Sequence, residues 1–204
     1  MAESRSWRFQ ARGWIGILAL LPLAFVAATS SPPVREDSTL DLVLDALAWG
    51  CWIAGGGLRF WATLYVGGRK SREVVSAGPY SICRHPLYLG SFFLAVSVGL
   101  FLDSLVLAAG ILAAVSGYAL FTVPAEERYL RERLGEAYAR YCESVPRFLP
   151  RLRGFQTAAL LEVRVKSLRT ECLRAAGWAF IPVLLETLSH LRERPWWPHW
   201  FTLP

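Results

Sequence analysis

Two short polar stretches carry the residue types that a binding or catalytic site needs. The sequence GPYSICRHPLYLG sets Arg84, His85 and Tyr88 where an apolar run begins. The second stretch holds two adjacent glutamates, Glu126 and Glu127, just after another apolar run. Imidazole and carboxylate groups accept hydrogen bonds or protons, and tyrosine rings attract cations through their faces. Brought together, the two stretches could bind a polar or cationic ligand.

The elements that would position these stretches are helices in a membrane. Hydrophobic residues make up 54% of the 204 positions and the mean hydropathy is +0.34, which is too apolar for an ordinary soluble domain. We therefore predict one all-α, membrane-embedded domain. The net charge of +6 sits mostly between apolar runs. This pattern is typical of the cytoplasmic ends of spans and of contacts with anionic membrane lipids, and argues against a nucleic-acid surface.

Four apolar runs predict the core transmembrane helices: Trp14–Ala28, Leu40–Val66, Pro86–Leu102 and Leu105–Val123. The first run is short enough to be a signal peptide, but a retained helix allows the other three to pair. Lysine and arginine gather near the N-terminus, at residues 69–72 and after the fourth run. These segments are therefore placed on the cytoplasmic side, and the four spans alternate consistently across the membrane.

The polar turn Asp103-Ser104 is so short that the third and fourth runs must be antiparallel neighbours. Small residues predict close helix packing on two of the runs. They are Gly110, Ala114 and Gly117 on the fourth run, and Gly50, Ala54 and Gly55 to Gly57 on the second.

The chain beyond Pro124 begins with a charged helix, which should cover the cytoplasmic face of the bundle. An amphipathic basic helix from Thr157 to Arg174 is suited to the membrane interface. The last apolar run, Ala175–Leu191, is followed by Arg192 and Arg194, and a full span would leave these arginines on the wrong side. An interfacial or re-entrant helix is therefore favoured over a fifth spanning helix.

Metal and disulfide chemistry have weak support in the sequence. The four cysteines, at positions 51, 83, 142 and 172, show no CxxC spacing. Glu186 and His190 lie one helical turn apart and could form a metal or proton site, but no third ligand is visible. Interfacial polar residues are the favoured interpretation of this pair.

The predicted topology brings the two polar stretches together, because they enter and leave the same hairpin on its cytoplasmic side. A cavity there would hold Tyr80, Arg84, His85, Tyr88 and Glu126.

Each residue also has a purely structural interpretation. Pro86 suits the first turn of a helix, and the two glutamates suit the positive end of the next helix dipole. Glu127 has Arg131 four residues on as an ordinary surface partner, whereas Glu126 has only Leu130 there and is freer to serve a ligand.

The ordered combination of motifs is more specific than its parts. GPYSICRHPLYLG, a hairpin, and then EERYLRERLGEAYARYCESVPRFLP resembles the integral-membrane methyltransferases typified by isoprenylcysteine carboxyl methyltransferase, and phospholipid N-methyltransferases share the signature. The resemblance covers residues 70 to 150. It implies a methyl transfer from S-adenosyl-L-methionine, bound in a cytoplasmic pocket, to a lipophilic acceptor that enters from the bilayer. The chain then divides into N-terminal transmembrane helices (1–68), a methyltransferase core (69–150) and a membrane-associated extension (151–204).

The resemblance also implies which residues contact the cofactor. A carboxylate can accept hydrogen bonds from a ribose diol or an ammonium group, and tyrosine rings can attract the sulfonium. Arg84 could offset the cofactor carboxylate. No catalytic base and no metal ligand stands out. The implied contacts, with Arg84 added, are Val74, Val75, Tyr80, Arg84, His85, Pro86, Leu87, Tyr88 and Glu126.

One departure leaves the acceptor open. Family members that methylate a carboxylate carry an arginine one turn before the binding glutamate, and Thr122 stands at that position here. The acceptor atom could therefore be oxygen, nitrogen or sulfur.

Two other functions compete with methyl transfer. Membrane sterol reductases share the RHPxY signature and use NADPH, but they have more spans than this chain allows. A lipid-binding or scaffold protein without enzymatic activity could keep the same fold. A soluble-type methyltransferase is disfavoured, because the glycines at 55–57 follow no predicted strand.

Overall fold

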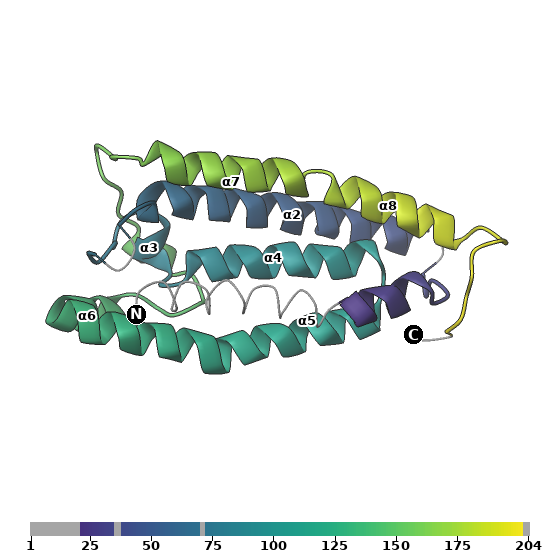
Figure 1. The fold of residues 1–204 in the computed structure, drawn as a ribbon, viewed down its shortest axis with the longest axis horizontal. Coiled ribbons are helices and arrows are strands. Elements are labelled where there is room, and N and C mark those ends of the chain that lie inside the picture. The colour runs from purple at the N-terminus through teal and green to yellow at the C-terminus, as the bar shows by residue number, and fades with distance from the viewer. Residues whose placement is uncertain (1–20, 35–37, 70–71, 202–204) are drawn as a thin grey trace.

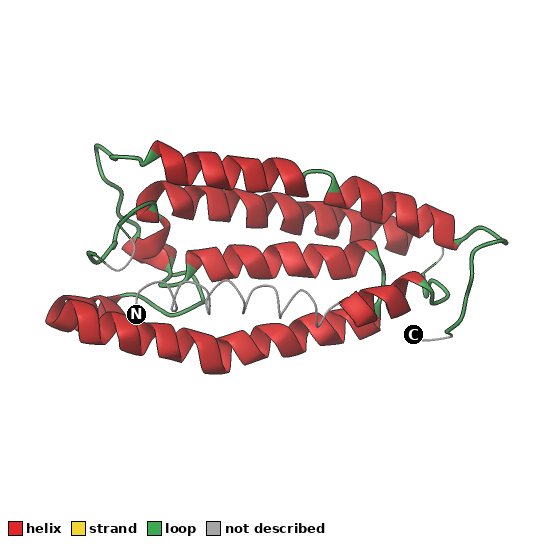
Figure 2. Ribbon diagram, in the orientation of Figure 1, coloured by secondary structure: helices red, strands yellow, loops and turns green. Residues whose placement is uncertain are grey.

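The computed structural model describes residues 21–34, 38–69 and 72–201, which form a helical bundle (Figure 1). Figure 2 shows helices and loops, and the described residues contain no strand beyond an isolated bridge between Ser30 and Phe201. The all-α prediction is therefore confirmed for this part of the chain. The first part of the predicted first helix, residues 14–20, lies outside the described residues, and the rest, residues 21–28, is helical. The named helices are α2 (Thr39–Val66), α3 (Pro79–Ile82), α4 (Pro86–Phe101), α5 (Leu105–Gly117), the π-helix η1 (Tyr118–Thr122), α6 (Val123–Ser144), the 3-10 helix η2 (Leu152–Gly154), α7 (Val165–Trp178) and α8 (Ile181–Arg192).

Helices α2 and α4 approach each other at a pair of glycines. A Cβ atom on Gly55 would lie 2.7 Å from the Gly90 carbonyl oxygen, and a Cβ atom on Gly90 would lie 2.9 Å from the Gly55 oxygen. Because real Cβ atoms do not come so close, any larger residue would push the helices apart. The predicted close contact of the second run is thus confirmed at Gly55. Gly50 and Gly56, and Gly117 on α5, have open space where a Cβ would be.

Helices α5 and α6 are joined through η1 into one element, Leu105–Ser144, of 40 residues. In η1 the Val123 N–H bonds to the Tyr118 carbonyl, which is the spacing of a π-helix. Pro124 accounts for the wider turn, because it has no N–H for the carbonyl of Leu120 and its ring crowds the preceding turn. The helix therefore continues through Pro124 into α6, and both glutamates lie near the start of α6.

Helices α7 and α8 lie along α2 and reach from one end of the bundle to the other (Figure 1). Val165–Arg192 and Leu105–Ser144 are the two described stretches that are long and apolar enough to cross a membrane, and Pro86–Phe101 is a shorter apolar helix. The predicted amphipathic helix begins at Val165 and not at Thr157. The charge argument against a fifth span is weakened for Arg192, which is fully buried in the bundle, but still applies to Arg194, which is exposed.

The two ends of the bundle differ in what they hold. The motif loop, which we define as residues 78–85, lies with the start of α4 at the end that we call the cavity end (Figure 1). The predicted turn at Asp103-Ser104 joins α4 to α5 at the opposite end, together with the end of α8.

Candidate functional site

The motif loop is held in place by tight local geometry. Gly78 has a φ of +61°, a conformation that favours glycine, and a Cβ there would lie 2.4 Å from the Tyr65 ring. Tyr80 lies in the short helix α3, and its carbonyl accepts a hydrogen bond of 2.8 Å from the Tyr141 hydroxyl on α6. His85 precedes α4, whose first residue is Pro86, a position where the missing N–H costs nothing. The loop therefore presents its side chains from a fixed backbone.

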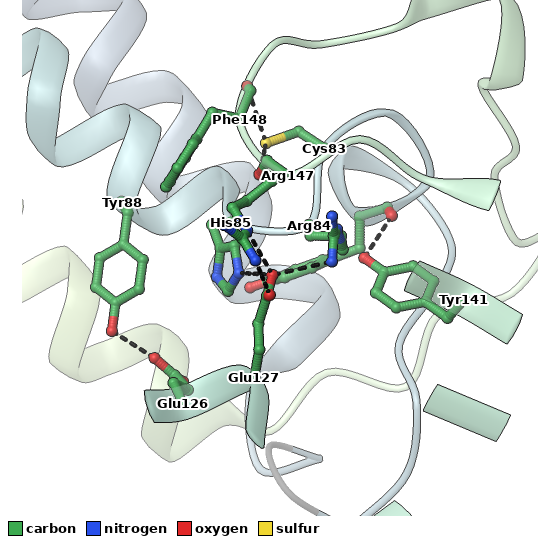
Figure 3. A network of polar contacts seen from close by, with 10 residues as sticks. Cys83, Arg84, His85, Tyr88, Glu126, Glu127, Tyr141, Arg147 and Phe148 are labelled. Atoms are coloured by element: carbon green, nitrogen blue, oxygen red, sulfur yellow. Dashed lines mark hydrogen bonds and ion pairs between the residues drawn. The ribbon is translucent and has the colours of Figure 1, made fainter. Parts of the chain in front are cut away.

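Glu127 is the centre of a cluster of positive and polar groups (Figure 3). Its carboxylate lies 3.0 Å from Arg84 Nη1, 3.0 Å from His85 Nε2 and 2.6 Å from Arg147 Nη2. The predicted surface pair with Arg131 is thus wrong, since the Glu127 side chain is only 7% exposed and its partners Arg84, His85 and Arg147 lie outside its own helix. The reason is the fold: α6 turns this carboxylate towards the motif loop and not along its own surface.

The surroundings of Glu127 keep it ionised. This residue lies beyond the apolar part of its helix, which ends at Val123. Burial alone would raise the pKa of the Glu127 carboxyl, but hydrogen bonds from His85 and Arg147 and the charge of Arg84 lower it to about 2. At neutral pH Glu127 is therefore an anion that ties the motif loop to α6.

Glu126 points to a different place from its neighbour. Its Oε2 accepts a hydrogen bond of 2.5 Å from the Tyr88 hydroxyl (Figure 3). The Tyr88 ring in turn stacks on His85 with 5.6 Å between ring centroids. The two glutamates thus serve separate partners on the same motif, as expected for adjacent helical residues that point about 100° apart.

A segment to which the sequence analysis assigned no role in the site completes it. We call residues 145–157 the strap. Backbone hydrogen bonds join the strap to the motif loop: Arg84 N to Pro146 O at 2.9 Å, Arg151 N to Ile82 O at 3.0 Å, and Gly78 N to Gln156 O at 2.7 Å. The strap also supplies Arg147 to the Glu127 cluster. No local pattern signals this role, because Arg147 and Glu127 meet only after α6 has ended and the chain has turned back.

A cavity of about 110 Å³ lies between the motif loop, α4 and α6. All nine residues proposed from the sequence as cofactor contacts line it, whereas Glu127 does not. Four residues of α6, Leu130, Leu134, Tyr138 and Tyr141, also line the cavity and were not among the predicted contacts. The lining residues are Val66, Glu73, Val74, Val75, Tyr80, Arg84, His85, Pro86, Leu87, Tyr88, Glu126, Leu130, Leu134, Tyr138 and Tyr141.

Arg84 has a different environment from the one expected. Its guanidinium pairs with Glu127, so its charge is already offset within the protein. Its Nε atom is buried and makes no hydrogen bond in the described part of the chain. Burial raises the pKa of the nearby Cys83 thiol, and this side chain contacts the strap carbonyls of Arg147 and Phe148. The motif loop is thus held to the strap by its side chains as well as by its backbone.

The second candidate pair, Glu186 and His190, forms no site of its own. The Glu186 carboxylate accepts a hydrogen bond of 2.7 Å from the Trp49 indole, which ties α8 to α2. His190 Nδ1 lies 2.9 Å from the Glu186 backbone carbonyl. Among the described residues, no group of three or more histidine, cysteine, aspartate or glutamate side chains is placed to hold a metal ion.

Comparison with known proteins gives one family and several relatives. The model of the isoprenylcysteine carboxyl methyltransferase (ICMT) family matches residues 42–132. This match includes the motif loop and both glutamates but ends before the strap. No solved structure gives a significant match.

Two bacterial relatives carry names that refer to metal resistance. The nickel-cobalt-cadmium resistance protein NccN of Alcaligenes xylosoxydans is 34% identical over 146 residues, which cover 72% of this chain and 68% of the relative. The cobalt-zinc-cadmium resistance protein CzcN of Cupriavidus metallidurans is 30% identical over 183 residues, which cover 89% of this chain and 84% of the relative. A plant relative, protein-S-isoprenylcysteine O-methyltransferase B of Arabidopsis thaliana, is 28% identical over 98 residues, which cover 48% of this chain and 50% of the relative.

Proposed function

Because the chain belongs to the ICMT family, we propose that it is an integral-membrane methyltransferase that uses S-adenosyl-L-methionine to methylate a lipophilic acceptor. One observation carries the proposal: the eight residues that the resemblance assigns to the cofactor, and Arg84 beside them, line a single cavity. They come from the chain before α4, from α4 itself and from α6, so only the folded hairpin brings them together.

The chemistry of the cavity suits this cofactor. The Glu126 carboxylate can accept hydrogen bonds from hydroxyl or ammonium groups, and the faces of Tyr80 and Tyr88 can attract a sulfonium. Val74 and Leu87 offer apolar surface for an adenine ring. When bound, the cofactor would supply an activated methyl group. The protein would align the acceptor with that methyl group and keep water away.

The cavity is smaller than a complete cofactor site. Its volume of about 110 Å³ is below the roughly 300–1,000 Å³ of ordinary small-molecule pockets. We therefore expect side chains around the cavity to rearrange when the cofactor binds, while the Glu127 cluster continues to hold α6 to the motif loop. The hydrogen bond between Tyr88 on α4 and Glu126 on α6 would open first.

Membrane placement follows from charge and length. We propose four core spanning helices, with α7–α8 as a fifth spanning element and the cavity end in the cytoplasm, where lysine and arginine gather. The acceptor would then enter from the bilayer between helices. Residues 1–68, 69–150 and 151–204 would act as N-terminal helices, methyltransferase core and extension of this one bundle.

Metal binding has no comparable support. The bacterial relatives are named for metal resistance, but the described residues hold no cluster that could bind a metal ion. Methyl transfer is therefore the function that the site supports best.

Isothermal titration of the detergent-purified protein with S-adenosylhomocysteine and with NADPH tests the proposal. We expect binding of S-adenosylhomocysteine and none of NADPH. Binding of NADPH alone would indicate a reductase, and binding of neither nucleotide would favour a lipid-binding or scaffold protein.

A further inference from the structure

The His85 imidazole lies between the Glu127 carboxylate and the Tyr88 ring (Figure 3). Its Nε2 atom is 3.0 Å from Glu127 Oε1. An ionised carboxylate can only accept hydrogen bonds, so Nε2 must carry the hydrogen of this contact. The carboxylate thus selects the tautomer of the ring, as the buried aspartate does in a serine protease triad.

The other ring nitrogen, Nδ1, is left for a ligand. His85 lines the cavity, and no described residue makes a hydrogen bond to Nδ1. The Tyr88 ring, stacked at 5.6 Å, and the Phe148 ring, at 5.9 Å, hold the plane of the imidazole. A neutral His85 therefore offers a fixed lone pair to whatever occupies the cavity.

The charges around the imidazole do not require it to be protonated. Arg84, beside it in the chain, and Arg147, from the strap, already offset the Glu127 carboxylate. The other titratable groups that face this cluster from α4 and α6 are Tyr88, Glu126 and Tyr138. Glu127 therefore does not depend on an imidazolium for charge balance, and the imidazole is available as a base.

We infer that His85 is the base that receives the proton of the methyl acceptor, and that the acceptor is an amine, a thiol or a hydroxyl group and not a carboxylate. This inference rests on the proposed function and names the acceptor class of the same site. The acceptor heteroatom uses a lone pair to form the new bond to the methyl carbon. The bond from that carbon to sulfur breaks, and its electron pair stays on sulfur. The proton of the heteroatom passes to Nδ1 and then to water.

The arginines near the motif loop give independent support. A carboxylate acceptor would need a cation beside it, and the family arginine that could provide one is replaced by Thr122. Arg84 and Arg147 are both bound to Glu127. Arg59 pairs with Glu171 at 2.9 Å and also donates to Ser91. Each of these three arginines is therefore already paired with a carboxylate of the protein. A neutral acceptor group that loses a proton needs no such cation and needs only the base.

Nitrogen-15 NMR of labelled histidine tests the tautomer without any acceptor. The chain has three histidines, and comparison with His85→Gln assigns the signal of interest. At pH 8 we expect a neutral ring with hydrogen on Nε2 and a bare Nδ1. Hydrogen on Nδ1, or a ring that stays doubly protonated, would overturn the inference.

Methyl-labelled S-adenosylmethionine tests the acceptor class. The protein in detergent is offered dodecylamine, dodecanethiol, dodecanol and dodecanoic acid, which share one chain length and differ only in the head group. We expect label in the amine, the thiol or the alcohol. Label in dodecanoic acid, or in none of the four while S-adenosylhomocysteine still binds, would overturn this inference but not the proposed function. Loss of S-adenosylhomocysteine binding in the wild type would instead contradict the proposed function.

A variant separates a base from a cofactor contact. His85→Gln keeps an N–H for Glu127 but has no basic nitrogen. At saturating cofactor we expect its single-turnover rate to fall about 10²–10⁴-fold. His190→Gln, on the exposed face of α8, is the matched control and should keep the wild-type rate. If His85→Gln loses only affinity and keeps its rate, His85 is a cofactor contact and not the base.

Discussion

Each end of the bundle encloses an arginine, but the two arginines bond to different kinds of acceptor group. At the cavity end Arg84 pairs with the Glu127 carboxylate next to a hollow that accepts a ligand. At the opposite end Arg192 is fully buried and donates to backbone carbonyls, at 2.7 Å to Leu102 and at 3.1 Å to Ser30. Both carbonyls lie at helix ends, where the partial negative charge of the helix dipole favours a cation.

The difference indicates that the charge of Arg192 serves the stability of the fold, whereas the charges around Glu127 also serve ligand binding. The carbonyls that Arg192 contacts are positioned by the backbone fold, so Arg192 joins α8 to α4 and to the end of the first described helix. At the cavity end the contacts are between side chains, which can change partners. The cluster around Glu127 can therefore keep the motif loop in place while the hydrogen bond between Tyr88 and Glu126 gives way to bonds with a ligand. We expect substitutions at the Arg192 end to change stability alone and substitutions around the cavity to change binding as well.

The largest effect should come from Arg192→Ala. The substitution leaves two buried carbonyl groups without a donor and removes a packed side chain, which should cost roughly 2–5 kcal/mol of unfolding free energy. Thermal unfolding in detergent measures this loss. The affinity of the folded fraction for S-adenosylhomocysteine should not change.

Arg194→Ala is the matched control, because this arginine is exposed and lies only two residues away. It should unfold at nearly the wild-type temperature. Equal losses in the two variants would show that charge near the end of α8, and not the buried contact of Arg192, stabilises the protein.

Much of the cavity end could be predicted because its arrangement follows from one hairpin of consecutive helices. A hairpin with a short turn must bring its two outer ends together, and this places the motif loop next to Glu126 whatever the remaining helices do. The pairing of Glu127 could not be predicted in the same way. The rule for residues four apart favours Arg131, but the actual partner Arg147 reaches Glu127 only through the strap.

The opposite end shows why the membrane position of α8 could not be predicted from charge alone. Counting arginines by membrane side assumes that each one lies in water. Arg192 does not lie in water, because it donates hydrogen bonds to carbonyls at the ends of two other helices. No pattern in the sequence around Arg192 indicates these contacts. The π-turn of η1 is a similar case: Pro124 signals a disturbance, but whether the helix breaks or widens depends on packing around it.

The next largest expected effect is a difference in cofactor affinity between variants of Glu126 and Glu127. Glu126→Ala removes a charged acceptor that lines the cavity, and we expect S-adenosylmethionine affinity to fall about tenfold to a hundredfold, or roughly 1.5–3 kcal/mol. Glu127→Ala should weaken binding less and lower the unfolding free energy by about 3 kcal/mol, because it leaves Arg84 buried without its anion. Titration calorimetry and thermal unfolding of both variants decide the matter. A larger loss of affinity in Glu127→Ala would reverse the assignment and make the cluster part of the binding surface.

The smallest effect is a dependence of stability on pH at the cavity end. The folded pKa of Glu127 is about 2, below its ordinary value of 4.5, so the folded state binds this proton less readily than the unfolded chain. The stabilisation is therefore present above pH 4.5 and is lost as the pH falls from there towards 2. At pH 4 the loss should stay below about 1 kcal/mol, because most of the carboxylate is still ionised and solvent screens the 42% exposed Arg147.

Glu127→Gln measures how much the Glu127 charge contributes to stability, because the amide has a similar shape and does not titrate in this range. Its unfolding temperature should lie below that of the wild type at pH 7, and the gap should narrow at pH 4. Glu143→Gln, at an exposed position of α6, supplies the control and should show no such gap at either pH. A gap that stays constant between pH 7 and pH 4 would mean that the Glu127 cluster is not held together by the carboxylate charge, and the contrast with the carbonyl-bound Arg192 would no longer hold.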